Sequence, residues 1–377
     1  MKIVCHREGL LEACQLVSVA VAPRSVNEIL HNIKMIVDEE RCTLIATDEE
    51  VGISMTVGSV QEVENPGEVL LPSSRVLSIL RETTDQVITI EADPDSCSIR
   101  GEKAEFEMMG QDPSIFMPVP SFEGDQYHQM SAGVLRNMIR RTNFAVSNQD
   151  QTKYAAMTGI LWEFDGDMAR LVATDGRRLA LCEGPAAQHG SHSTQDKIPA
   201  VPDKAMTLLE RNLQDPEEAV RVAIRTNDIL IKTERATIHS RLVEGRFPNY
   251  SQVIPKNSGV RLPLDIPRFF AAVRQAAIMT DEESQAVTFA FGDGKLTLQA
   301  RGAGAGRSKV ELDLEYNDEP LEISFNPKYL VEMLRVVNED EEMTLDLVDG
   351  RTAAVFRNAD NNYTYVVVPL VPNAPKG

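Results

Sequence analysis

A repeat that recurs about every third of this 377-residue chain restricts its fold more than any other feature. A helix-like segment with a proline near its first turn and a basic residue soon after occurs three times, and the basic markers Arg75, Lys204 and Lys328 lie 129 and 124 residues apart. Proline is favoured there because its missing N–H would be unpaired in any case. Self-similarity at a long period predicts several similar modules rather than one large core.

A second amphipathic segment also occurs three times, so we expect six helices, at residues 7–19, 73–82, 131–144, 203–212, 265–279 and 327–338. The sequence between these helices alternates between apolar and polar residues with a period of two and is interrupted by Asp, Gly and Asn turns. This pattern is typical of antiparallel sheets with one buried face. We therefore predict an α+β fold of three repeats, each with two helices on antiparallel sheets. The expected domains are residues 1–123, 128–255 and 259–372, followed by a tail at 373–377.

The formal net charge of -19 argues against a nucleic-acid partner, because affinity for phosphate comes mainly from Lys and Arg that release counterions. The charge is unevenly distributed, however. The six helical windows hold twelve basic and seven acidic residues, a net of +5, which leaves -24 for the rest of the chain. If the helices share one face, that face is mildly positive and can hold a polyanion only weakly, so retention would need enclosure rather than affinity. The alternative is that these cations merely cover solvated helix faces.

Motifs for chemistry are not found: we see no P-loop, H-E-x-x-H, EF-hand loop or G-x-S-x-G elbow, and we expect no catalytic residue, metal or cofactor. The glycine-rich segment ARGAGAGRS at 300–308 has a strand-like sequence on both sides, which predicts a hairpin loop. His189 and His192 have ligand-like spacing but lie in a polar segment that indicates a surface loop. The five cysteines show no C-x-x-C spacing and are expected to be buried free thiols.

The N-terminal MKIVCHREGLLEACQ is charged too early to be a signal core, and no apolar run approaches 18 residues. These observations predict a soluble, cytoplasmic protein.

Three short stretches are more specific: ATDGRRLAL at Ala173, RLVEGRFPNYSQVIPKN at Arg241 and YVVVPL at Tyr365. Together with the repeat and the opening MKIVCHREGLLEACQLVS, they make the chain similar over essentially its whole length to the bacterial DNA polymerase III beta subunits, the sliding clamps. The resemblance implies a non-enzymatic processivity subunit, a head-to-tail homodimer whose ring encircles double-stranded DNA. It also implies docking of the DNA polymerase III alpha subunit, the clamp loader and other polymerases and repair proteins through short peptides, with no membrane partner. Two alternatives are an acidic protein-protein scaffold without DNA enclosure and a hydrolase with an unrecognised site.

The resemblance also implies three sets of site residues. The expected peptide-binding pocket, between the second and third repeats, comprises Met157, Thr174, Gly176, Arg177, Arg178, Leu179, Pro248, Val253, Asn326, Tyr329, Val366, Val368, Pro369 and Leu370. On the DNA-facing side the resemblance implies Arg24, Arg81 and Gln149, to which charge alone adds Arg136, Arg140 and Arg141. The expected dimer contacts are Phe106 and Met108 on one side and Ile278 and Met279 on the other. Arg177 stands where several relatives have histidine.

Overall fold

The computed structural model describes residues 1–148, 154–194, 198–256, 259–281, 285–302, 304 and 306–370. Its contacts divide the chain into two compact units. The first consists of residues 1–136, 164–167 and 185–243, and the second of residues 137–163, 168–184 and 244–377. The division therefore passes through the middle of the central repeat.

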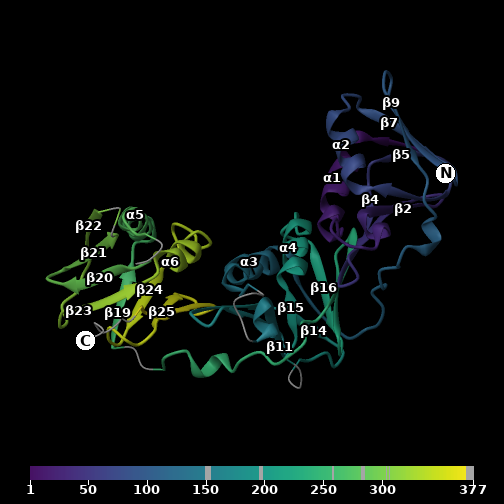
Figure 1. The fold of residues 1–377 in the computed structure, drawn as a ribbon. Helices are drawn as coiled ribbons and strands as arrows, with labels where there is room; N and C mark the ends of the chain where they lie inside the picture. The colour runs from purple at the N-terminus through teal and green to yellow at the C-terminus, as the bar shows by residue number, and fades with distance from the viewer. Residues whose placement is uncertain are drawn as a thin grey trace. The chain divides into compact units, whose positions relative to one another are not determined.

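All six predicted helices are present, and each has one buried apolar side in its sequence pattern. They are α1 (Arg7–Val17), α2 (Ser73–Glu82), α3 (Ala132–Thr142), α4 (Asp203–Asn212), α5 (Ile266–Ala277) and α6 (Pro327–Leu334). The last helix is shorter than predicted, because the Val336 N–H bonds to the Met333 carbonyl in a tighter turn. In the first unit α1 packs against α2, and in the second α5 packs against α6 (Figure 1).

The first unit contains two antiparallel sheets. The five-stranded sheet has the order β5 (Val60–Asn65), β1 (Lys2–His6), β7 (Val87–Ala92), β8 (Ser96–Arg100) and β9 (Glu105–Met109). The nine-stranded sheet has the order β14 (Ala187–His189), β10 (Tyr127–Ser131), β16 (Ala219–Ile224), β17 (Asp228–Lys232), β18 (Ala236–Arg241), β4 (Val51–Val57), β3 (Cys42–Thr47), β2 (Asn32–Val37) and β6 (Gly67–Pro72). The short strand β15 (Ala200–Pro202) leads into α4.

In the second unit the larger sheet runs through β11 (Gly159–Asp165), β12 (Met168–Thr174), β13 (Arg178–Pro185), β26 (Tyr363–Val367), β25 (Ala354–Asn358), β24 (Met343–Leu347) and β19 (Val260–Leu264). The smaller sheet has the order β22 (Gly306–Asp313), β21 (Lys295–Gly302), β20 (Val287–Gly292) and β23 (Leu321–Phe325), and α5 covers β21 and β22. The two ends of the segment ARGAGAGRS pair as β21 and β22, with Gly302 opposite Gly306, as its flanks predict, while Ala303 and Ala305 lie outside the described residues.

Strand pairing explains why the compact units do not coincide with the repeats. Strand β18 of the second repeat pairs with β4 of the first, with Ile238 opposite Ile53. In the same way β26 of the third repeat pairs with β13 of the second, with Tyr365 opposite Ala180. Each repeat therefore completes a sheet of the repeat before it. Strands β9 and β22 occupy outer positions in their sheets.

The five cysteines are free and buried, as predicted. Burial raises the pKa of the Cys5, Cys42 and Cys182 thiols to about 12. At neutral pH these side chains are protonated and unreactive, since the thiolate is the nucleophilic form. They act as small apolar core residues.

Candidate functional site

The turn between β12 and β13 is fixed by its own side chains. The Asp175 carboxylate accepts hydrogen bonds from the backbone N–H groups of Arg177 (2.9 Å) and Arg178 (3.0 Å). The Thr174 hydroxyl donates to the Arg178 carbonyl (2.6 Å) and accepts from the Gly176 N–H (3.1 Å). Gly176 has φ 84°, a left-handed conformation that residues with a Cβ rarely adopt. The predicted turn is therefore present, and its geometry is fixed by the side chains of both Thr174 and Asp175.

Arg178 anchors this turn to the third repeat. Its side chain is only 7% exposed and forms ion pairs with Asp175 (3.0 Å) and with Glu332 on α6. It also donates to the Phe144 carbonyl at 2.6 Å, and the guanidinium lies over the rings of Phe144 and Tyr329. A guanidinium that is held by several hydrogen bonds and packs against two aromatic rings is fixed in one orientation. Arg178 is thus primarily a positioning residue for the wall of the site.

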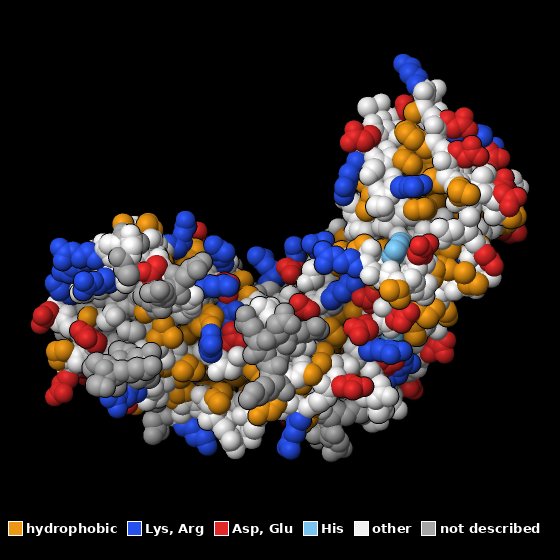
Figure 2. Space-filling model, in the orientation of Figure 1, with side chains coloured by type: hydrophobic (Ala, Val, Ile, Leu, Met, Phe, Trp, Pro, Cys, Tyr) orange, Lys and Arg blue, Asp and Glu red, His pale blue; other side chains and the backbone are white. Residues whose placement is uncertain are grey.

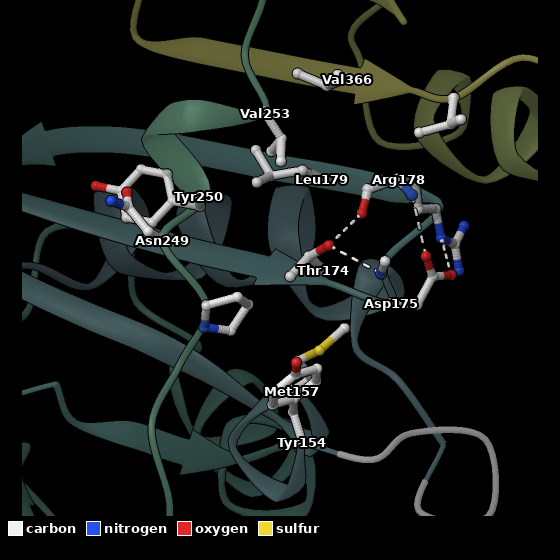
Figure 3. A pocket seen from close by; sticks show the side chains of 13 residues that line it. Tyr154, Met157, Thr174, Asp175, Arg178, Leu179, Asn249, Tyr250, Val253 and Val366 are labelled. Carbon is white, nitrogen blue, oxygen red and sulfur yellow. Dashed lines mark hydrogen bonds and ion pairs between the residues drawn. The ribbon is translucent and has the colours of Figure 1, made fainter.

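Beside this turn lies a cavity of about 470 Å³, which we call the apolar cavity. Its lining residues are Tyr154, Met157, Thr174, Asp175, Gly176, Arg178, Leu179, Pro248, Asn249, Tyr250, Val253, Val366 and Val368. Figure 3 shows Leu179, Val253 and Val366 together at one end and Met157 with Tyr154 at the other, with Thr174 between them. Val253 and Val368 remain 57% and 46% exposed, and such apolar surface at the rim of a cavity is typical of a binding site.

One wall of the apolar cavity is stiffened by a polar cluster. The Tyr250 hydroxyl donates to the Glu163 carboxylate at 2.5 Å, and Arg170 contacts the same hydroxyl at 3.3 Å. Burial, together with the Glu163 contact, raises the pKa of Tyr250 to about 12. The phenol therefore stays neutral, and its ring is fixed as a flat apolar surface.

A second cavity of about 480 Å³ adjoins the first and shares Asp175 and Arg178 with it. We call it the polar cavity. Its lining residues are Val146, Ser147, Asn148, Asp175, Arg177, Arg178, Ala277, Thr280, Gln285, Asn326, Pro327, Lys328, Tyr329 and Val331.

The structure divides the predicted pocket residues among three places. Nine of them line the apolar cavity: Met157, Thr174, Gly176, Arg178, Leu179, Pro248, Val253, Val366 and Val368. Arg177, Asn326 and Tyr329 line the polar cavity instead. Pro369 and Leu370 are among the lining residues of neither, because the chain turns back onto β23, where the Leu370 N–H donates to the Ser324 carbonyl at 2.7 Å. Sequence reasoning missed Tyr154, Asp175, Asn249 and Tyr250; the last two belong to the GRFPNY motif and could have been included.

The predicted DNA-facing set needs one correction. Arg24, Arg81, Arg136 and Arg140 have exposed side chains, and Figure 2 shows basic side chains over the helices of each unit. Arg141, in contrast, is 4% exposed and forms a bidentate ion pair with Glu341, at 2.9 and 2.5 Å. Its charge is neutralised inside the second unit, so its assignment to this set was wrong. Gln149 lies outside the described residues.

Two further helix cations have partners within the first unit. Arg7 donates to the carbonyls of Leu80 (2.8 Å) and Asp85 (3.1 Å), which closes the end of α2. Lys204 forms an ion pair with Asp48 at 2.5 Å. The basic excess that the helices present to solvent is therefore smaller than their sequence count.

The predicted dimer contacts also need a correction. Phe106 is 36% exposed and Ile278 is 70% exposed, whereas Met279 is half-buried. Met108 is only 5% exposed, because it lies opposite Cys97 and points into the core. Met109, at 85% exposure, is the methionine that β9 presents outward.

The histidines hold a feature that the sequence analysis missed. His128 and His192 are both buried, and their Nδ1 atoms lie 2.6 Å apart. The Ile224 N–H donates to His192 Nε2, which requires that the proton of His192 sit on Nδ1. His128 then accepts that proton's hydrogen bond and donates from Nε2 to the Gly166 carbonyl. The segment predicted as a surface loop is thus anchored in the core of the first unit.

Within the described residues, no group of three or more His, Cys, Asp or Glu side chains could hold a metal ion. None of the helices in that part of the chain is both long enough and apolar enough to cross a membrane.

Comparison with known proteins gives matches along the whole chain. Models of the DNA polymerase III beta subunit match residues 1–117 (N-terminal domain), 129–249 (central domain) and 251–371 (C-terminal domain). The beta sliding clamp of Pseudomonas putida is 31% identical, covering 98% of this chain and 100% of the relative, and that of Escherichia coli K12 is 28% identical with the same coverage. A crystal structure of a Pseudomonas aeruginosa sliding clamp bound to griselimycin is 28% identical with a TM-score of 0.89, covering 99% of this chain and 100% of that one. These similarities do not support the scaffold alternative.

Proposed function

Because this chain belongs to the DNA polymerase III beta subunit family, whose members are beta sliding clamps, we propose that it works as a ring that encircles duplex DNA. It is the non-catalytic processivity subunit of DNA polymerase III. Two copies of the chain form the ring, which tethers the replicative polymerase to its template in the cytoplasm. The observation that carries this proposal is the match to the family along the whole chain. The edge strands β9 and β22 offer a way to close the ring.

Ring closure follows from the way the repeats are joined. Strand β18 pairs with β4, and β26 pairs with β13, so each junction uses the same type of strand pair. Strand β9 of the first repeat and β22 of the third, which both lie at sheet edges, are the two strands that the same type of pairing would join. A second copy can pair them reciprocally, which gives a closed head-to-tail dimer and removes two exposed edges.

The two edges carry complementary side chains. Strand β9 presents the carboxylates of Glu105 and Glu107, whereas the first half of β22 presents Arg307 and Lys309 and its second half Glu311 and Asp313. Phe106 and Met109 add exposed apolar surface on one side, and Ile278 adds it on the other. Opposite charges set the register of such an interface, and the apolar contacts supply most of its stability.

Enclosure reconciles the acidic chain with a DNA partner. The exposed cations Arg24, Arg81, Arg136 and Arg140 are too few to hold DNA by counterion release alone. A closed ring needs no tight contact, and a weakly basic inner surface can slide along the phosphates through water-mediated contacts. Binding is then independent of sequence.

The apolar cavity is the proposed docking site for partner proteins. Its size and exposed valines suit the aliphatic or aromatic anchors of a short peptide, while the rigid turn at Asp175–Gly176 fixes the wall. The DNA polymerase III alpha subunit, the clamp loader, other polymerases and repair proteins would share this site.

Retention on closed DNA tests the proposal. The protein is loaded onto a nicked circular duplex by its clamp loader with ATP, and the complex is isolated by gel filtration. We expect the protein to stay on the circle and to be lost after a single restriction cut, unless the new ends are blocked. Equal retention on circular and cut DNA would contradict enclosure.

A further inference from the structure

A third cavity, of about 590 Å³, lies in the first unit near the edge of the nine-stranded sheet, and we call it the β10 groove. It shares no lining residue with the apolar cavity or the polar cavity. Its lining is mostly apolar and includes Met130, Val134, Pro185 and Ala219. A volume of this size is within the range of about 300–1,000 Å³ that is usual for ligand sites.

Strand β10 lacks a neighbour along the side that faces this groove. Strand β16 pairs with it as far as Ser131, whereas β14 pairs with it only as far as Gln129. Because β14 is the last strand of the sheet, Met130 and Ser131 have no strand partner on that side among the described residues. The chain before β14 turns away from β10, since the Ala186 N–H donates to the Asp167 carbonyl at 2.8 Å. An open edge of this kind is a template for an added strand.

The charged side chains that line the β10 groove are all acidic. Asp167 and Glu217 are both exposed, and no Lys, Arg or His is among the lining residues. The Asp167 carboxylate accepts a hydrogen bond from the Gln188 N–H at 2.9 Å, and neither carboxylate forms an ion pair within the described part of the chain. At the start of α3 the Ala132 and Gly133 N–H groups already donate to backbone carbonyls, so they are not available to an anion. The groove therefore favours a positively charged occupant.

We propose that the β10 groove is a further docking surface, which takes an extended segment of a partner protein in which Lys or Arg alternates with aliphatic residues. The segment adds a strand to β10 beside Met130 and Ser131, where main-chain hydrogen bonds supply affinity. Successive side chains of a strand point to opposite sides, so aliphatic residues cover the apolar lining while the basic residues between them reach Asp167 and Glu217. This inference does not depend on docking at the apolar cavity.

Peptide titration of the full-length protein tests the inference. The basic peptide, acetyl-Lys-Val-Lys-Val-Lys-amide, is compared with a neutral peptide that has Gln in place of Lys. Two further basic peptides are N-methylated at every Val or at every Lys, which blocks one or the other hydrogen-bonding edge. In protein labelled with ¹⁵N-methionine, the Met130 amide signal, assigned with M130L, reports binding at the groove. We expect the basic peptide to bind about tenfold more tightly than the neutral one, since each of two exposed ion pairs changes affinity about threefold. One of the N-methylated peptides should lose binding.

E217Q should weaken binding of the basic peptide about threefold and leave the neutral peptide unchanged, because it removes one exposed charge. E39Q is the matched control, since Glu39 is an exposed glutamate in the turn after β2, near the opposite edge of the same sheet.

Three results would overturn the charge complementarity: no shift of the Met130 signal, equal binding of the basic and neutral peptides, or the same weakening in E39Q as in E217Q. Equal binding of both N-methylated peptides would overturn strand addition. A Met130 shift on concentrating the protein alone would assign the groove to a second copy of the chain and also overturn the proposal.

Discussion

The same hairpin occurs twice in this molecule, after β3 in the first unit and after β12 in the second. In both, an Asp carboxylate accepts two backbone N–H groups, Asp48 from Glu50 and Val51 and Asp175 from Arg177 and Arg178. A Thr hydroxyl closes each turn, and the residue after the Asp has positive φ, 80° and 84°. The strand that follows pairs in each case with a strand of the next repeat.

The surroundings of the two hairpins differ. Four residues after Asp48 lies Gly52, and a Cβ built there would come within 2.8 Å of the Val119 side chain. The equivalent residue after Asp175 is Leu179, which borders the apolar cavity. The first hairpin is thus covered by the exit segment of its own repeat, whereas the second is left open. Both repeats contain the hairpin that can form the wall of a site. Whether a cavity lies beside the hairpin depends on the segment that packs next to it.

The polar anchors of the two hairpins differ as well. Asp48 is held by Lys204, whose side chain is 35% exposed, while Arg178 is 7% exposed and bridges Asp175 and Glu332. A single ammonium on a flexible stem constrains its partner less than a stacked guanidinium with several hydrogen bonds. The open hairpin is therefore the more rigidly held one, as a preorganised binding wall should be.

The largest effect is expected from breaking that anchor. R178M leaves two carboxylates without their buried partner and should destabilise the second unit by about 3 kcal/mol. K204M at the first hairpin should cost under about 1 kcal/mol, because that pair is partly exposed. Urea unfolding followed by circular dichroism measures both, and equal losses would remove the contrast between the anchors. Replacing Glu332 with Gln as well as Arg178 with Met should recover part of the loss.

A smaller effect is expected at the cavity rim. V253D places a charge on exposed apolar surface of the site and should weaken docking of a Leu-Phe peptide by about tenfold, with little change in folding. V348D is the matched control, since Val348 is 40% exposed in the same unit but outside the cavity. Unchanged affinity in V253D, or an equal loss in V348D, would show that the cavity does not bind the peptide. L179A is less clean, because Leu179 is only 2% exposed and contributes to the core.

The smallest expected effect is a difference between the two units in how their stability depends on pH. All six histidines lie in the first unit, and burial lowers the pKa of His128 there, with Asp167 opposing and His189 reinforcing the shift. His128 is therefore neutral when folded, and its pKa is near 6.5 when unfolded. Because the folded-state pKa of this base is lowered, the stability that neutral His128 contributes is complete above pH 6.5. That stability is lost as the pH falls below 6.5, by at most about 1.4 kcal/mol per pH unit for one proton.

Native-state hydrogen exchange, corrected for intrinsic rates, measures this difference between pH 7.5 and 5.5. Protection of β10 and β16 should fall more than protection of β25 and β26. H192Q should reduce the pH dependence, whereas H6Q, at an exposed position, should keep it. The same loss in both units would show that acid acts through groups other than the buried imidazoles.

Much of the fold follows from local pattern. The six helices and the Asp175–Gly176 turn are each specified by residues close together in the sequence, so periodicity and turn chemistry find them. Most of the apolar cavity was also found, because its members lie within short motifs of a known family.

The wrong predictions concern which side of a helix or strand a residue faces, and contacts between residues far apart in the sequence. Arg140 and Arg141 are adjacent and equally basic, yet only Arg141 turns inward. It does so to pair with Glu341, which is 200 residues away along the chain, and no local pattern reveals that partner. Met108 rather than Met109 faces the core because of the register of β9 on β8. The pairing of His128 with His192 likewise depends on tertiary contacts that no local pattern encodes.

The central claim is that the second hairpin, and not its equivalent in the first repeat, forms the docking site. A Leu-Phe peptide with a photoreactive group on the phenylalanine, cross-linked to the full-length protein and mapped by mass spectrometry, tests it directly. The account predicts cross-links within residues 154–157, 174–179, 248–253 and 366–368, and their loss in V253D. Cross-links of comparable yield at residues 47–52 or 116–119 would contradict it.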